Sequence, residues 1–282
     1  MGTEASQETK TTLVLGGTGR TGRRVVERLK VRGLPTRVGS PSAELPFDWE
    51  DRAIWAPALR NVESVYVSYY PDLAVTGAVA AVRSFASLAV EAGIRRLVLL
   101  SGRGEEEAQH AERVVQEAGA EWTVVRCAWF NQNFSESYLL EPVLAGEVVL
   151  PAGDVPEPFV DAEDIADVAV AALTEAGHAG ELYELTGPRL LTFKEAVGKI
   201  ARAAGREIRF VPISVEEYSS MLAKHEVSAE FVSLLTYLFS EVLDGRNAYR
   251  ADGVQRALGR EPREFADYAG DAAATGVWDG GR

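Results

Sequence analysis

The sequence has few of the side chains that build disulfides and metal centres. Its 282 residues include one cysteine, Cys127, so no intramolecular disulfide can form. The three histidines, His110, His178 and His225, stand far apart and show no zinc-ligand spacing. We therefore expect neither a disulfide framework nor a metal site.

Long apolar runs and excess positive charge are also absent. No segment approaches the roughly 18 apolar residues of a membrane span, and the opening MGTEASQETK lacks the apolar core of a signal peptide. Acidic side chains outnumber basic ones by 42 to 29, whereas nucleic acids and anionic membranes attract clustered positive charge. The sequence therefore predicts a cytoplasmic monomer or homodimer that binds neither nucleic acid nor membranes. Residues 1–10 are expected to form a disordered tail.

Short apolar segments alternate with helical patterns through the first half of the chain. The patterns predict strands at residues 11–15, 36–38, 65–68, 97–100 and 122–126. The helices between them are expected to stop at Gly33, Gly93 and Gly119. This alternation is typical of an α/β fold with a Rossmann-type doubly wound parallel sheet, which binds ligands at the carboxyl ends of its strands.

After about residue 128 the pattern changes. A helix capped by Asp161 and a strand at 183–185 are expected to return to the sheet. Further helices, two of them introduced by capping boxes, are predicted at 193–204, 215–224 and 229–243.

These elements suggest two domains. We expect residues 11–150, with return elements around 160–187, to form a dinucleotide-binding domain. Residues 188–282 are expected to form a smaller, mainly helical substrate-binding cap.

Three glycines, Gly16, Gly19 and Gly22, follow the first strand and open the first helix. At this spacing the first permits a tight turn, the second lets backbone approach a pyrophosphate, and the third permits close helix–strand packing. The helix N-terminus offers unpaired N–H groups to phosphates. We therefore expect a nicotinamide dinucleotide here. Other expected contacts in the loop are Thr18, Arg20 and Thr21.

The end of the second predicted strand bears on the choice of dinucleotide. NAD-selective proteins place an acidic residue roughly 20 residues after the glycine loop, where it binds the ribose 2′-hydroxyl. Here the strand ends in VGSPS, without a carboxylate. NADP(H) is therefore favoured, with Arg20 and Ser40 near the 2′-phosphate, and NAD(H) remains possible. Asp48 is a candidate acceptor for the adenine amino group, or an ordinary exposed loop residue.

Four motifs together resemble the NmrA-like atypical short-chain dehydrogenases, the set that includes festuclavine synthase, agroclavine dehydrogenase and NmrA-type quinone oxidoreductases. They are GGTGRTG, FDW at 47–49, LVLLSG at 97–102 and WTVVRCAWFNQNF at 122–134. The resemblance runs from about residue 11 to 269 and implies a Rossmann domain, a helical substrate domain and NADP(H). The arginine that the family often carries after the second strand falls at Pro41, which puts more weight on Arg20.

Short-chain dehydrogenases often pair a serine with a Tyr-x-x-x-Lys helix. Ser101 occupies the serine position, but the helix reads RGEEEAQH and has neither tyrosine nor lysine. Reducing a simple ketone requires a placed acid, whereas iminium ions need no proton and quinones or enones give stabilised anions. We therefore expect an NAD(P)H-dependent reductase of an activated aromatic or heterocyclic acceptor. The alternative is a non-catalytic, NmrA-like dinucleotide-binding redox sensor.

Several polar and aromatic residues near strand ends are candidate site residues. The candidates for acid or catalytic work are Tyr69, Ser101 and His110, although His110 also fits an ordinary surface position. Further candidates for cofactor contact are Ser68, Ser101 and Phe130. Candidates for substrate contact are Tyr70, Trp129 and Asn133. Plain aromatic packing is the alternative for Tyr69 and Tyr70, and a simple turn is the alternative for Asn133.

Overall fold

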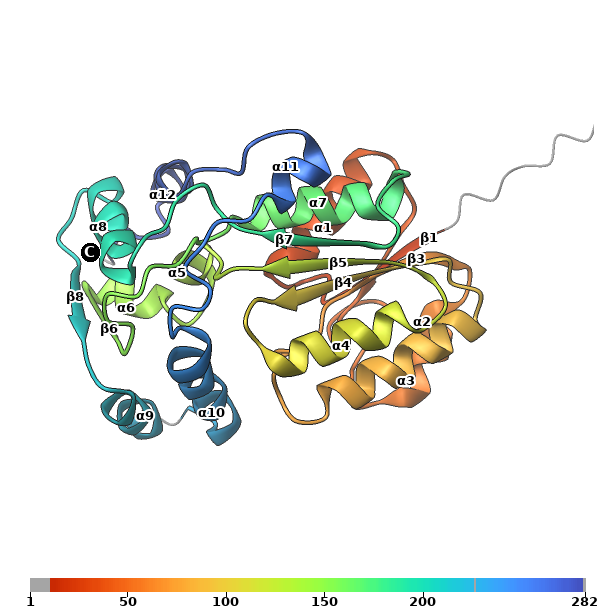
Figure 1. Ribbon diagram of the computed structural model, residues 1–282, viewed down its shortest axis with the longest axis horizontal. Coiled ribbons are helices and arrows are strands. Elements are labelled where there is room, and N and C mark those ends of the chain that lie inside the picture. The colour runs from red at the N-terminus through yellow and green to blue at the C-terminus, as the bar shows by residue number, and fades with distance from the viewer. Residues whose placement is uncertain (1–10, 226, 281–282) are drawn as a thin grey trace, which may run out of the picture.

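The computed structural model describes residues 11–225 and 227–280, and the expected tail at 1–10 lies outside them. The described part contains a six-stranded parallel sheet in the order β2-β1-β3-β4-β5-β7 (Figure 1). Its strands are β1 Thr11–Leu15, β2 Thr36–Gly39, β3 Val62–Val67, β4 Arg96–Gly102, β5 Glu121–Cys127 and β7 Glu181–Leu185. From β1, the chain first adds β2 on one side and then adds β3, β4, β5 and β7 in turn on the other side. The doubly wound α/β prediction is thus confirmed.

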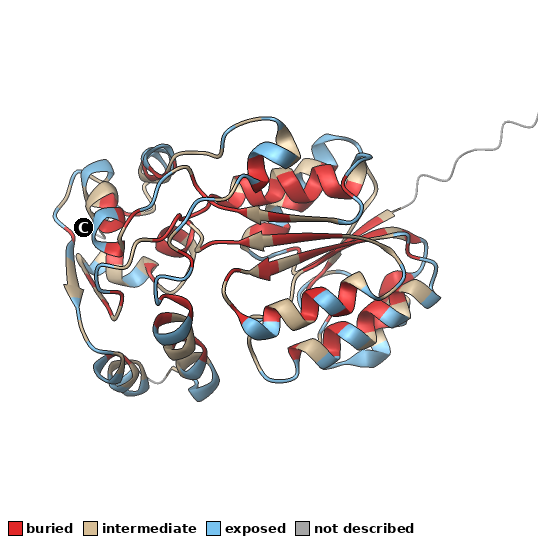
Figure 2. Cartoon of the chain, viewed as in Figure 1, coloured by how far each residue is buried: buried red, intermediate tan, exposed pale blue. Residues whose placement is uncertain are grey.

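Helices cover both faces of this sheet (Figure 1). On one face lie α1 Arg20–Val31, α7 Ala162–Thr174 and α11 Gly253–Leu258. On the other lie η1 Arg52–Ile54, α2 Trp55–Leu59, α3 Ala78–Glu91 and α4 Glu106–Gln116. Figure 2 shows buried residues concentrated in the strands and on the helix faces turned toward them. In α1, for example, Val25, Val26 and Leu29 are buried at helical spacing.

A second lobe is built around its own aromatic core. A small parallel ribbon pairs β6 Glu147–Leu150 with β8 Arg209–Pro212. The helices of the lobe are α5 Asn133–Glu136, α6 Leu140–Ala145, α8 Phe193–Ala203, α9 Val215–Lys224, α10 Ala229–Tyr237, η2 Leu238–Val242 and α12 Phe265–Ala274. The rings of Phe134, Phe159 and Phe193 have centroids 5.0–6.1 Å apart at its centre. Such offset and edge contacts add to the burial of large apolar side chains.

This lobe differs from expectation in two respects. Residues 134–150, expected in the first domain, contribute Phe134, Val143 and Val148 to the second core. The helix expected over 229–243 ends at Tyr237 and continues as the π-helical turn η2. The second lobe therefore begins earlier in the chain than residue 150.

The basic face of α1 is neutralised by neighbouring helices. Arg24 forms ion pairs with Glu136 of α5 at 2.7 Å and with Glu163 of α7 at 2.5 Å. Arg28 reaches Glu163 and Asp167 of α7, each at 2.6 Å. These arginines therefore fasten α1 to both lobes.

The acidic face of α7 also binds the segment that leads into α12. Asp164 is fully buried, and its Oδ2 accepts a hydrogen bond of 2.7 Å from the backbone N–H of Arg263. Its other oxygen pairs with the guanidinium groups of Arg263 and Arg260. Among the described residues, no helix is long and apolar enough to cross a bilayer.

Candidate functional site

A cleft of about 460 Å³ opens at the carboxyl ends of β1, β3, β4 and β5. The sheet side includes the glycine loop, residues 68–73 and residues 127–130. The opposite wall comes from α10 and η2 and is apolar, with Phe231, Leu234, Leu235, Leu238 and Val242. This is the crevice where doubly wound sheets bind ligands.

The glycine loop is shaped for a close approach. Gly16 adopts a left-handed conformation with φ of 64°, and its carbonyl accepts from the Gly19 N–H at 2.8 Å. A Cβ on Gly22 would lie 2.2 Å from the Gly16 oxygen, so only glycine lets α1 pack this tightly. Behind the loop, the buried Tyr66 hydroxyl donates to Thr21 Oγ1 at 3.0 Å. The start of α1 is therefore packed against β3 and the first glycine, on the side of the loop away from the cleft.

Arg20 takes a different direction from the one expected. Its guanidinium donates to the Asn133 side chain and lies 5.5 Å from the ring centre of Phe130. Both partners follow β5, whereas Ser40 follows β2 on the far side of β1. As the first residue of α1, Arg20 points toward the extension of β5 that passes over the helix start. The structure therefore does not bring Arg20 and Ser40 together around one phosphate.

The residues expected around the adenosine lie outside the lining of the cleft. Ser40 is buried, and its hydroxyl lies 3.4 Å from the Ser42 hydroxyl. Asp48 Oδ1 accepts from the backbone N–H of Glu50 at 2.9 Å, as in a local turn. Thr18 is exposed. Their contacts with a cofactor remain predictions.

Ser101 and His110 each have an acidic partner on α4. The Ser101 hydroxyl donates to Glu112 Oε1 at 2.6 Å, and Arg126 also binds that carboxylate. Its proton is therefore engaged in a buried cluster, although Ser101 borders the cleft. His110 lies on α4 with its side chain 39% exposed, 3.5 Å from Glu107, and is not among the lining residues.

The other candidate residues do surround the cleft. They are Ser68, Tyr69, Tyr70, Trp129, Phe130 and Asn133. Tyr69 packs on Trp49 with ring centres 4.9 Å apart, and partial burial raises its pKa. Tyr70 is 82% exposed at the mouth. Trp129 packs on Phe239 of η2 at 4.9 Å, which joins the sheet side to the second lobe.

Three further lining residues escaped the sequence reading: Glu105, Tyr138 and Glu157. Each has a buried side-chain oxygen without a hydrogen-bond partner. Burial raises the pKa of Glu157 to about 7. Burial, and then the nearby Asp72 carboxylate, raise the pKa of Glu105 well above its usual range. In the sequence, Glu105 stood in an acidic run and Glu157 between two prolines, patterns that are typical of surface loops.

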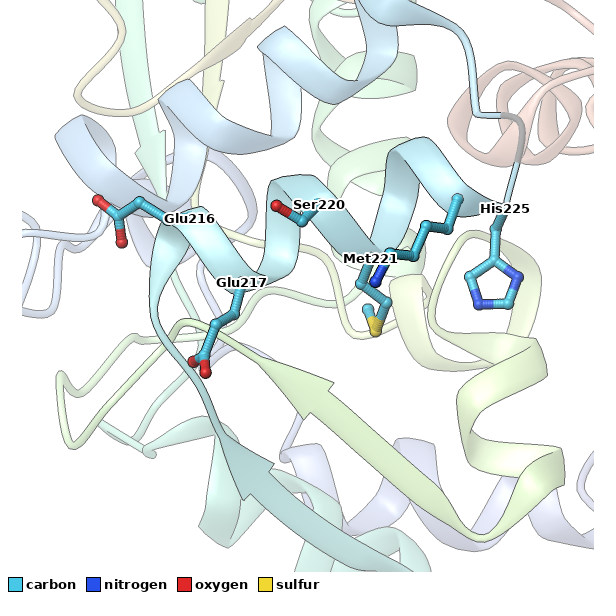
Figure 3. A pocket seen from close by; sticks show the side chains of 6 residues that line it. Glu216, Glu217, Ser220, Met221 and His225 are labelled. Atoms are coloured by element: carbon cyan, nitrogen blue, oxygen red, sulfur yellow. The ribbon is translucent and has the colours of Figure 1, made fainter.

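A second hollow, of about 410 Å³, lies along α9 and is shown in Figure 3. Its lining residues are Glu216, Glu217, Ser220, Met221, Lys224 and His225. They come from this helix and its end, with no strand terminus or glycine loop among them. Glu217 is already engaged in the capping box with Ser214. The cleft at the sheet is therefore the candidate functional site.

Comparison with known proteins is consistent with this location. Residues 16–176 match the model of a family described as NAD(P)H-binding. The chain is 32% identical to (4-alkanoyl-5-oxo-2,5-dihydrofuran-3-yl)methyl phosphate reductase of Streptomyces griseus subsp. griseus, across 93% of this chain and 97% of that one. It is 30% identical to NAD(P)H azoreductase of Xenophilus azovorans, across 94% and 99%. An NADPH-dependent quinone oxidoreductase from Escherichia coli, solved with NADPH, shares the fold, with a TM-score of 0.77, 20% identity and coverage of 92% and 99%.

Proposed function

Because this chain belongs to the NAD(P)H-binding family, among its NmrA-like atypical short-chain dehydrogenases, we propose that it is an NAD(P)H-dependent reductase of an activated small molecule. The observation that carries the proposal is the cleft itself. It joins a glycine loop suited to a dinucleotide with an apolar wall beside the strand ends. The acceptor class is an aromatic or heterocyclic quinone, enone, iminium or azo compound.

The residues at the loop fit the dinucleotide. Gly16 and Gly19 line the cleft with backbone that carries no side chain, Gly22 lets α1 pack closely behind them, and the start of α1 adds its N–H groups. Arg20 lies in the cleft beside this helix start and supplies a positive charge to the phosphates. When bound, the cofactor supplies the hydride.

The apolar wall from α10 and η2 binds the acceptor. Phe231, Leu234 and Leu238 present apolar surface across from Trp129. Such a wall excludes water and holds a flat acceptor against the nicotinamide, which is the main contribution a protein makes to hydride transfer. The relatives named for azo and dihydrofuranone reduction act on activated acceptors of this kind.

The preference between dinucleotides depends on the end of β2. No carboxylate stands in the run from Gly39 to Ser42, so nothing there repels a 2′-phosphate, and the exposed Ser42 can donate to it. We therefore propose NADP(H) as the preferred cofactor, with NAD(H) as an alternative.

Two measurements test this function. Calorimetric titration with NADPH and with NADH should show binding of at least one, tighter for NADPH. Loss of reduced-nicotinamide absorbance should then follow addition of a para-quinone, an azo dye or a cyclic iminium salt. Absence of binding would overturn the proposal. Tight binding without turnover of any acceptor class would favour the redox-sensor alternative, which the engaged Ser101 hydroxyl also suits.

A further inference from the structure

Glu157 holds an unusual position for an acidic side chain. The residue is 1% exposed, lines the cleft, and leaves its Oε1 atom without a hydrogen-bond partner. A buried polar atom without a partner is costly, typically by about 1–3 kcal/mol. Proteins tend to retain such a group where a ligand completes its contacts.

The backbone holds this carboxyl rigidly. Glu157 pairs with Leu191 in an antiparallel bridge, donating at 2.9 Å and accepting at 3.0 Å. The backbone N–H of Trp129, two residues beyond the end of β5, is near enough to lower the pKa of this carboxyl. The group is therefore fixed at the strand exit where the acceptor and nicotinamide are expected to meet.

The charges around Glu157 leave it able to hold a proton. Arg103 is the charged neighbour that lowers its pKa. That arginine is already committed to Glu184 at 2.9 Å and to the face of Tyr249 at 4.4 Å. Burial outweighs its influence, so that the pKa of Glu157 is about 7. Of the other carboxyls at this end of the cleft, Glu105 interacts with Asp72 and with Glu112.

We propose that Glu157 is the catalytic acid of this reductase and takes the place of the tyrosine that short-chain dehydrogenases usually supply. This inference rests on the proposed function. It applies to neutral acceptors, which need a proton as well as a hydride, and not to iminium ions.

The atoms and electrons balance without a further reactant. The acceptor gains a hydride with its electron pair at one atom, while the reduced nicotinamide loses its C4–H bond and is oxidised. The acceptor oxygen or nitrogen that becomes electron-rich takes the proton from the Glu157 carboxyl, whose O–H bond breaks. The Glu157 carboxylate then regains a proton from water when the product leaves.

Two neighbouring groups fit this role less well. The Glu105 carboxyl packs against the backbone of Gly102, where a Cβ would lie 2.0 Å from its Oε1. Its pKa also depends on the nearby Asp72 carboxylate. Tyr138 has a free buried hydroxyl, but burial raises its pKa well above the ordinary value and makes it a weaker acid near neutrality.

The test uses the full chain with saturating NADPH and compares a para-quinone with a cyclic iminium salt. In the wild-type protein, kcat for the quinone should fall as the pH rises through about 7, as the acid loses its proton. Glu157→Gln should lower kcat for the quinone by about 10²–10⁴-fold and abolish this pH dependence, with KM little changed. Iminium reduction by the same variant should persist.

Three further variants sharpen the result. Glu105→Gln and Tyr138→Phe should each retain the fall of kcat above pH 7. Glu157→Ala should regain quinone reduction when imidazole is added below about pH 7, since imidazolium is about the size of the lost side chain and can donate the proton, whereas a purely structural role would show no such rescue. An unchanged quinone kcat and pH profile in Glu157→Gln, or loss of the profile in Glu105→Gln or Tyr138→Phe instead, would overturn the inference. If the wild-type protein reduces no acceptor, the proposed function fails and this inference with it.

Discussion

Replacing Glu157 by glutamine should stabilise the protein at alkaline pH, even without any ligand. The folded state holds the pKa of this carboxyl at about 7, against an ordinary value of 4.5, because burial penalises the charged form. A raised pKa in the folded state means that the carboxyl favours folding while protonated. The contribution of Glu157 to the free energy of unfolding is therefore fully present below about pH 4.5 and is lost as the pH rises through about 7.

The size of the effect follows from the separation of the two pKa values. At about 1.4 kcal/mol per pKa unit, ionisation of Glu157 lowers the free energy of unfolding by about 3 kcal/mol at pH 8. About 2 kcal/mol of this loss develops above pH 5.5. Glutamine resembles the protonated acid in shape and cannot ionise, so the variant avoids the loss.

Urea unfolding of both proteins at pH 5.5 and at pH 8 measures this difference. The variant's advantage in free energy of unfolding should widen by about 2 kcal/mol between the two conditions. Glu216→Gln, which changes an exposed carboxyl on α9, serves as the matched control and should track the wild type. Parallel pH profiles for Glu157→Gln and wild type would refute the reasoning, because they would mean that Glu157 ionises as easily in the fold as in the unfolded chain.

Three other changes test the cofactor site and the scaffold. Arg20→Ala should weaken NADPH and NADH binding by a similar factor, about ten-fold or more, since the guanidinium lies on the Asn133 side of the loop. Titrations that showed a loss for NADPH alone would return Arg20 to the 2′-phosphate. Gly22→Ala should abolish binding of both dinucleotides by pushing α1 away from the Gly16 carbonyl, as calorimetry would show, while a bound cofactor of normal affinity would contradict the packing argument. Asp164→Ala should lower the free energy of unfolding by about 1–3 kcal/mol in urea, because the Arg263 backbone N–H loses its acceptor while both arginines keep Asp167 as a partner; a loss below about 0.5 kcal/mol would show that these contacts contribute little.

The sheet and its glycine loop could be predicted because they depend on local rules. Strand β1, the three glycines and the start of α1 follow one another in the sequence, and this spacing is typical of the turn that joins a strand to a helix at a dinucleotide site. The β6–β8 ribbon was missed for the opposite reason. Each strand has four residues, and their pairing partners lie 62 positions apart, as for Glu147 and Arg209. No local pattern reports such a contact.

The candidate site shows the same division. Tyr69, Trp129 and Asn133 follow predicted strands, and the structure places them around the cleft. Glu157 lies outside any predicted element, and its importance comes from burial against Trp129 and Leu191, which only the folded chain brings together. The direction of the Arg20 side chain likewise depends on Asn133, which the fold brings next to the start of α1 and which no local pattern predicts.

Helix α7 covers one face of the sheet and is bound through its acidic side by arginines from both ends of the chain. Arg24 of α1 pairs with Glu163, and Asp167 pairs both with Arg28 of α1 and with Arg260 and Arg263, which precede α12. The chain's early and late segments are thus both bound to one helix that contributes no residue to the cleft lining. A chain that ended before Arg260 would lose both arginines and α12, and we expect the second lobe, which supplies the apolar wall, then to be held less firmly against the sheet.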